Sequence, residues 1–152
     1  MKILLAVDGS EYSEAATQAL ALRMRPEGIE VLVLRVVEPR VFATSPQLEQ
    51  TYASERGKIL KEDHERAQES VNLASQALRA AHFHVNTRVV EGEARSAILE
   101  VAEEWGADLI VLGSHGRKGL QRFLLGSVAE SIARHAGCAV QIVRLSRHRK
   151  GR

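Results

Sequence analysis

The stretch Asp108-Leu-Ile-Val-Leu-Gly-Ser-His-Gly116, followed after nine residues by Gly126-Ser127, decides the fold. Residues 108–112 are predicted to form a strand, because a continuous apolar run of this length is typical of a strand buried on both faces of a parallel sheet. Residues 127–136 follow with a helical pattern. A strand, a glycine-rich loop and a helix in this order indicate a parallel α/β unit.

On both sides of this stretch, short apolar runs alternate with helical patterns. The other predicted strands cover residues 2–7, 30–37, 84–91 and 139–144. The other predicted helices cover residues 11–25, 46–81 and 94–105, with Gly106 as the C-terminal cap of the last. This alternation predicts an α/β fold, a doubly wound five-stranded parallel sheet with helices on both faces. We expect one domain over residues 1–145 and a basic, disordered tail over residues 146–152.

The helix predicted over residues 46–81 carries one apolar stripe, and Ser45-Pro46 is a typical helix start. The stripe members are spaced by three and four residues, as the helical repeat requires. They are Leu60, His64, Ala67, Val71, Ala74, Leu78 and Ala81. We expect His64, as a member of this stripe, to be half-buried.

The composition excludes several classes of protein. Apolar residues make up 45% and charged residues 26%, which is ordinary for a globular domain. Aromatic residues make up only 4%, so a base-stacking surface for nucleic acid is not expected. The single cysteine, Cys138, excludes an internal disulfide and indicates a reducing compartment.

The net charge of +2 arises from the last seven residues, which hold four basic side chains and no acid. Without them, 17 basic side chains face 19 acidic ones, so the body of the protein has no basic face. No apolar run reaches the length of a signal peptide or a membrane span. We expect a cytoplasmic protein that binds neither nucleic acid nor membrane.

The glycine-rich segment has the chemistry of an anion site. Ligands of such folds bind at the carboxyl ends of the strands, where the strand order reverses. Gly116 lets backbone N–H groups approach an anion, and Gly126-Ser127 opens a helix whose dipole favours phosphate. Arg117, Lys118 and Arg122 add positive charge. The spacing fits neither a Walker A loop nor the three-glycine dinucleotide fingerprint.

The pattern Gly-x2-Gly-x9-Gly-Ser resembles the ATP-binding branch of the universal stress protein family. Three further stretches extend the resemblance over nearly the whole chain: residues 7–10, residues 36–37 and residues 105–108. The segment Gly137-Cys138-Ala139 departs from the family, in which proline often flanks the cysteine. The resemblance implies a Rossmann-like fold with strand order 3-2-1-4-5.

The resemblance also implies which residues hold a nucleotide. The phosphates would lie against Gly113, Gly116, Gly126, Ser127 and Val128. Asp8 would bind the nucleoside end and the backbone of Val36 would contact adenine, while Ala6, Val7 and Arg117 complete the set. The resemblance implies ATP as the ligand, which could bind together with Mg²⁺. The function it implies is that of a nucleotide-dependent stress-response or signalling module.

Two of these residues have structural alternatives, and the function has two as well. Ser127 could cap its helix through the N–H of Glu130, and Asp8 could cap the helix over residues 11–25. We see no catalytic residue set, and His82 and His84 lack the carboxylate partner that a metal site would need. A slow Mg²⁺-dependent ATPase or nucleotidyl-transfer enzyme, and an interaction protein with a vestigial loop, remain alternatives.

The last predicted strand indicates how the chain assembles. Residues Ala139 to Arg144 form an apolar edge strand without proline, and an unprotected edge favours pairing with another chain. The resemblance points to the same strand. We expect a homodimer through it.

Overall fold

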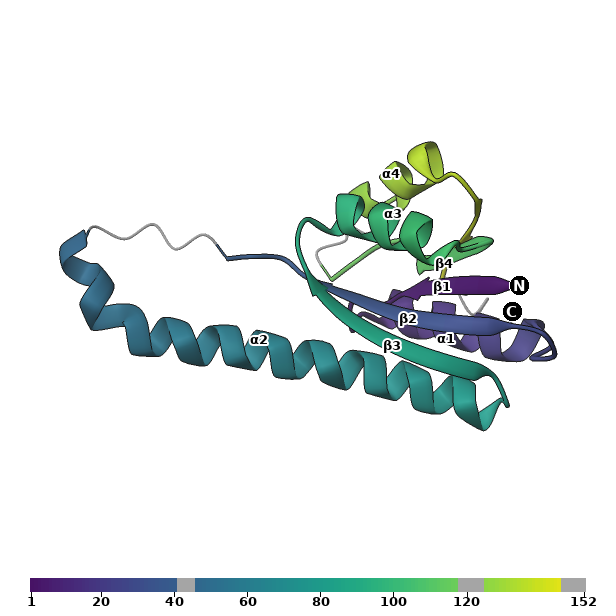
Figure 1. Ribbon diagram of the computed structural model, residues 1–152, viewed down its shortest axis with the longest axis horizontal. Helices are drawn as coiled ribbons and strands as arrows, with labels where there is room; N and C mark the ends of the chain where they lie inside the picture. The colour runs from purple at the N-terminus through teal and green to yellow at the C-terminus, as the bar shows by residue number, and fades with distance from the viewer. Residues whose placement is uncertain (41–45, 118–124, 146–152) are drawn as a thin grey trace, which may run out of the picture.

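A five-stranded parallel sheet forms the centre of the molecule (Figure 1). The computed structural model describes residues 1–40, 46–117 and 125–145. The strands are β1 (Lys2–Ala6), β2 (Glu30–Val37), β3 (His84–Glu91), β4 (Leu109–Gly113) and β5 (Ala139–Val143). Their order is β3-β2-β1-β4-β5, with all neighbours parallel. The predicted fold class and strand order are confirmed.

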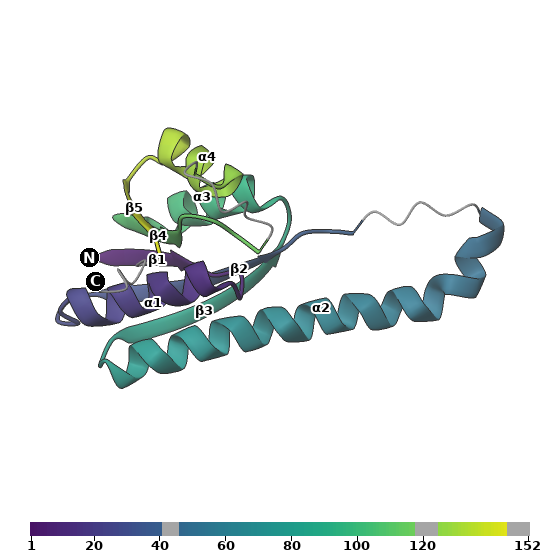
Figure 2. The same ribbon diagram turned by 180° about the vertical axis from the view of Figure 1, so that it is seen from behind.

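Helices cover both faces of this sheet. They are α1 (Glu11–Arg23), α2 (Pro46–Ala80), α3 (Ala94–Trp105) and α4 (Ser127–His135). Helices α1 and α2 lie on one face, and α3 and α4 lie on the other, as the views from the two sides show (Figures 1 and 2). The sheet is therefore doubly wound, as predicted.

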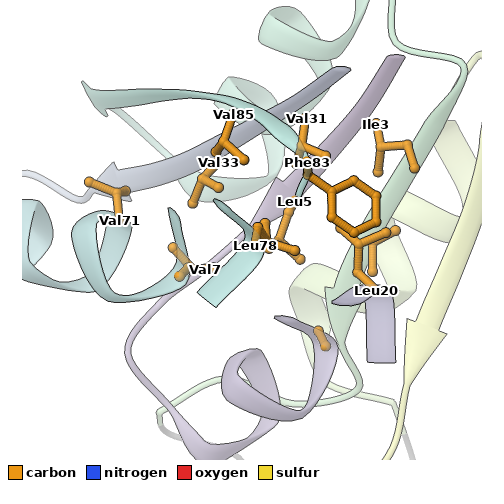
Figure 3. Close-up of a cluster of buried hydrophobic side chains, with 13 residues drawn as sticks. Ile3, Leu5, Val7, Leu20, Val31, Val33, Val71, Leu78, Phe83 and Val85 are labelled. Atoms are coloured by element: carbon orange, nitrogen blue, oxygen red, sulfur yellow. The ribbon is translucent and has the colours of Figure 1, made fainter. Parts of the chain in front are cut away.

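The two faces of the sheet carry separate apolar cores, because successive side chains of a strand point to opposite faces. In β1, Ile3 and Leu5 pack toward α1 and α2, where Leu20 and Leu78 meet them (Figure 3). Leu4, between them, belongs to the cluster with α3 and α4. This double burial explains why the strands are continuous apolar runs in the sequence.

The ends of some elements differ from the prediction by one or two residues. Helix α1 ends at Arg23 instead of Arg25, since Met24 already has an extended backbone with φ −104° and ψ 145°. Pro26 follows two residues later, and the residue before a proline disfavours the helical conformation. Gly106 caps α3 in the left-handed region with φ 70°, as predicted.

Helix α2 is buried along only part of its apolar stripe, and the expectation of a half-buried His64 is wrong. Ala67, Val71, Ala74 and Leu78 are buried, whereas Leu60 is 44% exposed and His64 is exposed. An eight-residue strand such as β3 spans about 26 Å, but a 35-residue helix spans about 52 Å. The helix therefore runs past the sheet, and its first half projects away from the body (Figures 1 and 2).

Several predicted features lie outside the described residues. They are the cap at Ser45, the loop cations Lys118 and Arg122, and the basic tail over residues 146–152. Within the described ranges, no helix is long and apolar enough to cross a membrane.

Candidate functional site

A cavity of about 1610 Å³ lies at the carboxyl edge of the sheet. Strand β1 has β2 on one side and β4 on the other, so the connections leaving β1 and β4 run to opposite faces. This divergence opens the edge between them. The cavity lining includes every residue predicted for the site: Ala6, Val7, Asp8, Val36, Gly113, Gly116, Arg117, Gly126, Ser127 and Val128.

Asp8 follows β1 and is fixed by the start of α1. One carboxylate oxygen, Oδ1, accepts hydrogen bonds from both the backbone N–H, at 3.0 Å, and the hydroxyl of Ser10. Ser10 is itself the N-cap of α1, because its Oγ accepts from the N–H of Ser13 at 3.3 Å. The alternative in which Asp8 caps α1 is therefore wrong. Asp8 instead orients Ser10, which caps α1.

The other oxygen of Asp8 reaches across the cleft to the loop after β4. Oδ2 accepts a hydrogen bond from the backbone N–H of Arg117 at 2.9 Å. A Cβ added to Gly116 would lie 3.0 Å from the same oxygen, so the absence of a side chain at Gly116 permits this approach. The structure thus brings Asp8 and the glycine-rich segment together, as the strand order led us to expect.

The two ends of that segment are held side by side. The N–H of Gly126 donates to the carbonyl of Ser114 at 2.8 Å. A Cβ on Gly126 would lie 3.2 Å from both Ser114 O and the Cα of His115, so this contact also depends on glycine. The start of α4 is thereby fixed beside the end of β4, at the mouth of the cavity.

Helix α4 differs from α1 and α3 at its first turn. The α1 start is occupied by the Ser10 hydroxyl beside the Asp8 carboxylate. The α3 start holds two carboxylates: Glu93 accepts from Ser96 N at 2.9 Å, and Glu38 accepts from Ala94 N at 3.3 Å. The N-cap of α4 is Gly126, which offers no side-chain hydrogen bond. Of these three starts, α4 alone has no side-chain acceptor at its first turn among the described residues, so the N–H groups that follow Gly126 and the positive dipole end can meet an external anion.

The capping-box alternative for Ser127 is wrong for the same reason. Gly126 is the N-cap, and the N–H of Glu130 donates to the carbonyl of Gly126 at 2.9 Å. Ser127 is the first residue of the helix and is exposed. Its hydroxyl is therefore not committed to the backbone of its own helix.

Arg35 is a cavity residue that the sequence analysis missed. It lies in β2 between Leu34 and Val36, and its Nη1 donates to the carbonyl of Val7 at 3.4 Å. Burial lowers the pKa of its guanidinium, and the negative charge of Asp8 opposes this shift. A single cation inside the apolar run of residues 30–37 is the signal that could have pointed to it.

His115 belongs to the loop after β4 and lines the cavity. Its ring lies 5.1 Å from the ring of Tyr12, between centroids, and its Nδ1 is 3.0 Å from Ser114 Oγ. Its Nε2 is buried and finds no hydrogen-bond partner among the described residues. From the sequence alone, His115 could either contact a ligand or face water. The structure shows that the ring packs on α1.

In the part of the chain that the structure describes, no group of three or more His, Cys, Asp or Glu side chains could hold a metal ion. The anion-attracting part of the site is instead made of backbone N–H groups, a helix dipole and arginine side chains. Such a set suits a ligand with phosphate or carboxylate groups.

The fold and the site together define an α/β protein with an open cleft at the carboxyl edge of its sheet. The profile of the Universal stress protein family matches residues 1–144, and the chain belongs to this family. A universal stress protein of Methanocaldococcus jannaschii is 35% identical over 145 residues, which are 94% of this chain and 81% of the relative.

Solved structures of the family share this fold. The universal stress protein UspA from Lactobacillus plantarum matches with a TM-score of 0.80 at 24% identity, over 95% of this chain and 97% of that one. The universal stress protein from Archaeoglobus fulgidus, in complex with dAMP, matches with a TM-score of 0.66 at 25% identity. That match covers 93% of this chain and 96% of the other.

Proposed function

We propose that this chain binds an adenine nucleotide in the cleft between β1, β4 and α4, and that ATP is its ligand. The single observation that carries the proposal is the uncapped start of α4 facing the cavity. The phosphates would accept hydrogen bonds from the N–H groups of Ser127 and Val128, since the N–H of Gly126 already donates to Ser114. Gly116 and Arg117 would approach them from the other end of the loop.

The nucleoside would lie on the β1 and β2 side of the cleft. Asp8 repels phosphate but accepts hydrogen bonds from ribose hydroxyls, so the carboxylate favours this orientation. The base would lie against the backbone of Val36, where Leu34, Ile98 and Leu112 supply apolar lining. The relative that was solved with dAMP supports an adenine nucleotide as the ligand class.

We propose a binding module in preference to an ATPase. Both oxygens of Asp8 already accept hydrogen bonds from Ser10 and Arg117, so this carboxylate is poorly placed to activate water. Mg²⁺ would enter with the phosphates, since it commonly keeps most of its waters and takes few protein ligands. The Ser127 hydroxyl is the free oxygen that it would meet at α4.

We also propose that the module acts as a homodimer through β5. Among the described strands β5 pairs only with β4, so its other edge has no partner within the described ranges. The side chains of Val140, Ile142 and Val143 are only partly buried. Pairing of two copies would cover both edges and these side chains.

The nucleotide proposal is tested by charge at the first residue of α4. The variant Ser127→Asp places a carboxylate where the phosphates would lie, and Ser127→Asn is its neutral control of nearly equal size. Calorimetric titration of the full chain with ATP should show binding weakened at least about tenfold in Ser127→Asp. Ser127→Asn should stay within about threefold of the unchanged protein, because it adds no charge.

Thermal unfolding without nucleotide separates lost binding from lost structure. A carboxylate in the first helical turn interacts favourably with the helix dipole, by about 0.3–1 kcal/mol. The Tm of Ser127→Asp should therefore not fall below that of Ser127→Asn. Equal ATP affinity in all three proteins would contradict the proposed site. Absence of binding by ATP, ADP and AMP would favour the interaction protein with a vestigial loop.

A further inference from the structure

The guanidinium of Arg35 is a half-buried cation with few partners in the cleft. Within the described ranges its one hydrogen bond is the long contact of 3.4 Å to the carbonyl of Val7. Its Nε is buried and has no acceptor among the described residues. Nor does any ion pair within 4.0 Å join Arg35 to a carboxylate in the described ranges. Most of its five N–H donors remain available.

The acidic groups around Arg35 are committed to other partners. Asp8 accepts from Ser10 and from Arg117, as described above. Asp63 on α2 forms a salt bridge of 2.7 Å with Arg40. Glu38 accepts from the N–H of Ala94 at the start of α3. All three attract Arg35 at longer range, and Arg117 repels it.

A charge that is withdrawn from water without a close partner is unfavourable. Burial lowers the pKa of Arg35 for this reason. Since the guanidinium lines the cavity, an anionic group of a ligand could supply the missing partner. The planar guanidinium is the side chain best suited to bind phosphate through two parallel hydrogen bonds.

The position of Arg35 across the sheet selects which phosphate it would meet. Arg35 lies on β2, Asp8 follows β1, and the loop that leads to α4 follows β4. The backbones of β2 and β4 are two interstrand steps apart, or about 10 Å, and the guanidinium of Arg35 extends only as far as the carbonyl of Val7, beside β1. The 5′-phosphates at α4 would thus lie on the far side of Asp8 from Arg35, with the ribose between.

We propose that Arg35 binds a second phosphate, carried on the ribose 2′ or 3′ hydroxyl of the bound adenine nucleotide. This inference rests on the function proposed above and names the class of its ligand: nucleotides phosphorylated at both ends of the ribose. Arginine near the ribose is a general means of recognising a 2′-phosphate in doubly wound nucleotide-binding folds.

The test compares ligands that differ in where the second phosphate lies. AMP, ADP, adenosine 2′,5′-bisphosphate and adenosine 3′,5′-bisphosphate are titrated into the full chain by calorimetry. ADP matches the bisphosphates in phosphate number but places both on the 5′ side. We expect at least one bisphosphate to bind about tenfold or more tighter than AMP.

Two variants assign this preference to a residue. Arg35→Gln should reduce the preference to less than about threefold while AMP affinity stays nearly unchanged. Arg40→Gln is the matched control: it removes a cation from the same cavity, but one that is paired with Asp63. It should retain the preference. Circular dichroism and thermal unfolding of both variants check that the fold is intact.

Three results would overturn the inference. If AMP binds and neither bisphosphate binds more tightly, Arg35 has no such role and the proposed function stands. If Arg35→Gln weakens ADP as much as the bisphosphates, Arg35 meets the 5′ chain instead. If none of the four ligands binds, the inference fails, and if ATP does not bind either, the proposed function fails with it.

Discussion

At the scale of single residues, the glycine that ends β4 and the glycine in the loop after it have different reasons to be glycine. A Cβ on Gly113 would lie 2.7 Å from the backbone carbon and the Cβ of Tyr12 on α1. A Cβ on Gly116 would meet only the carboxylate of Asp8, at 3.0 Å. Gly113 therefore permits the packing of α1 on β4, whereas Gly116 permits a contact within the cleft.

This difference predicts that alanine lowers the stability more at Gly113 than at Gly116. Gly113→Ala should lower the free energy of unfolding by about 1–3 kcal/mol, because backbone and Cβ atoms of Tyr12 cannot easily move. Gly116→Ala should cost less than about 1 kcal/mol, since a side-chain carboxylate can rotate and alanine restricts the unfolded chain. Urea unfolding of both variants measures this. Equal losses would show that the loop, and not α1, limits Gly113.

Asp8 and Gly116 could be predicted as neighbours because strand order alone brings the ends of β1 and β4 together. Arg35 could not be predicted as a cavity residue. Whether its side chain turns toward the cleft or toward solvent depends on how far α2 covers that end of β2. The helical pattern in the sequence of α2 does not indicate at which residue the sheet beneath the helix ends.

At the scale of the elements, the contacts at the first turn of each helix determine whether an external anion can bind there. The start of α3 is occupied by Glu93, which accepts from Arg95 and from Ser96. These hydrogen bonds, that of Arg95 foremost, lower the pKa of Glu93 from 4.5 to about 2. The ionised carboxylate therefore stabilises the start of α3 and also excludes other anions from it.

The lowered pKa predicts how stability depends on pH. Because the folded pKa lies below the unfolded value, the contribution of Glu93 is fully present above about pH 4.5. It is lost as the pH falls through about 2. The effect should be small, since the side chain is 44% exposed and solvent screens it. Unfolding free energies of the wild type and Glu93→Gln should differ at pH 6, and the difference should shrink below pH 4.5 and vanish as the pH falls through about 2. A constant difference would contradict the assignment.

Helix α2 offers a second prediction at this scale. Leu78 is fully buried, so Leu78→Ala should lower the free energy of unfolding by about 2–5 kcal/mol. Leu60 belongs to the same sequence stripe but is exposed, and Leu60→Ala should change stability by less than about 0.5 kcal/mol. Chemical denaturation checks both. A large loss in Leu60→Ala would indicate that the projecting half is covered in solution.

The strands and helices themselves were predictable, because short continuous apolar runs indicate the buried strands and apolar residues at helical spacing indicate the helices. Strands β2 and β3 and helix α3 have the predicted bounds. The extent of the packed stripe on α2 was not predictable. A helix can keep an apolar spacing beyond the end of the sheet on which it packs. The sequence shows this spacing but not the position at which the sheet ends.

At the scale of the whole molecule, the open edge of β5 predicts the oligomeric state. In a two-fold dimer through this strand, each Gln141 would lie near its symmetry mate, so Gln141→Lys would place like charges together. The unchanged protein should scatter light as a species of about twice 16.7 kDa at micromolar concentration. Gln141→Lys should shift it to the monomer. A stable monomer of the unchanged protein would contradict the dimer.

The projecting half of α2 has a hydrodynamic consequence. The twenty residues before Arg66 extend about 30 Å along the helix axis. A compact domain of this length has a radius of gyration of only about 15 Å. Friction and rotational diffusion will therefore be those of an elongated particle, and a single chain will elute from a sizing column ahead of compact standards of its own mass. The elution volume of the single chain would then resemble that of a compact dimer. Association of this protein therefore has to be measured by a method that determines mass independently of shape.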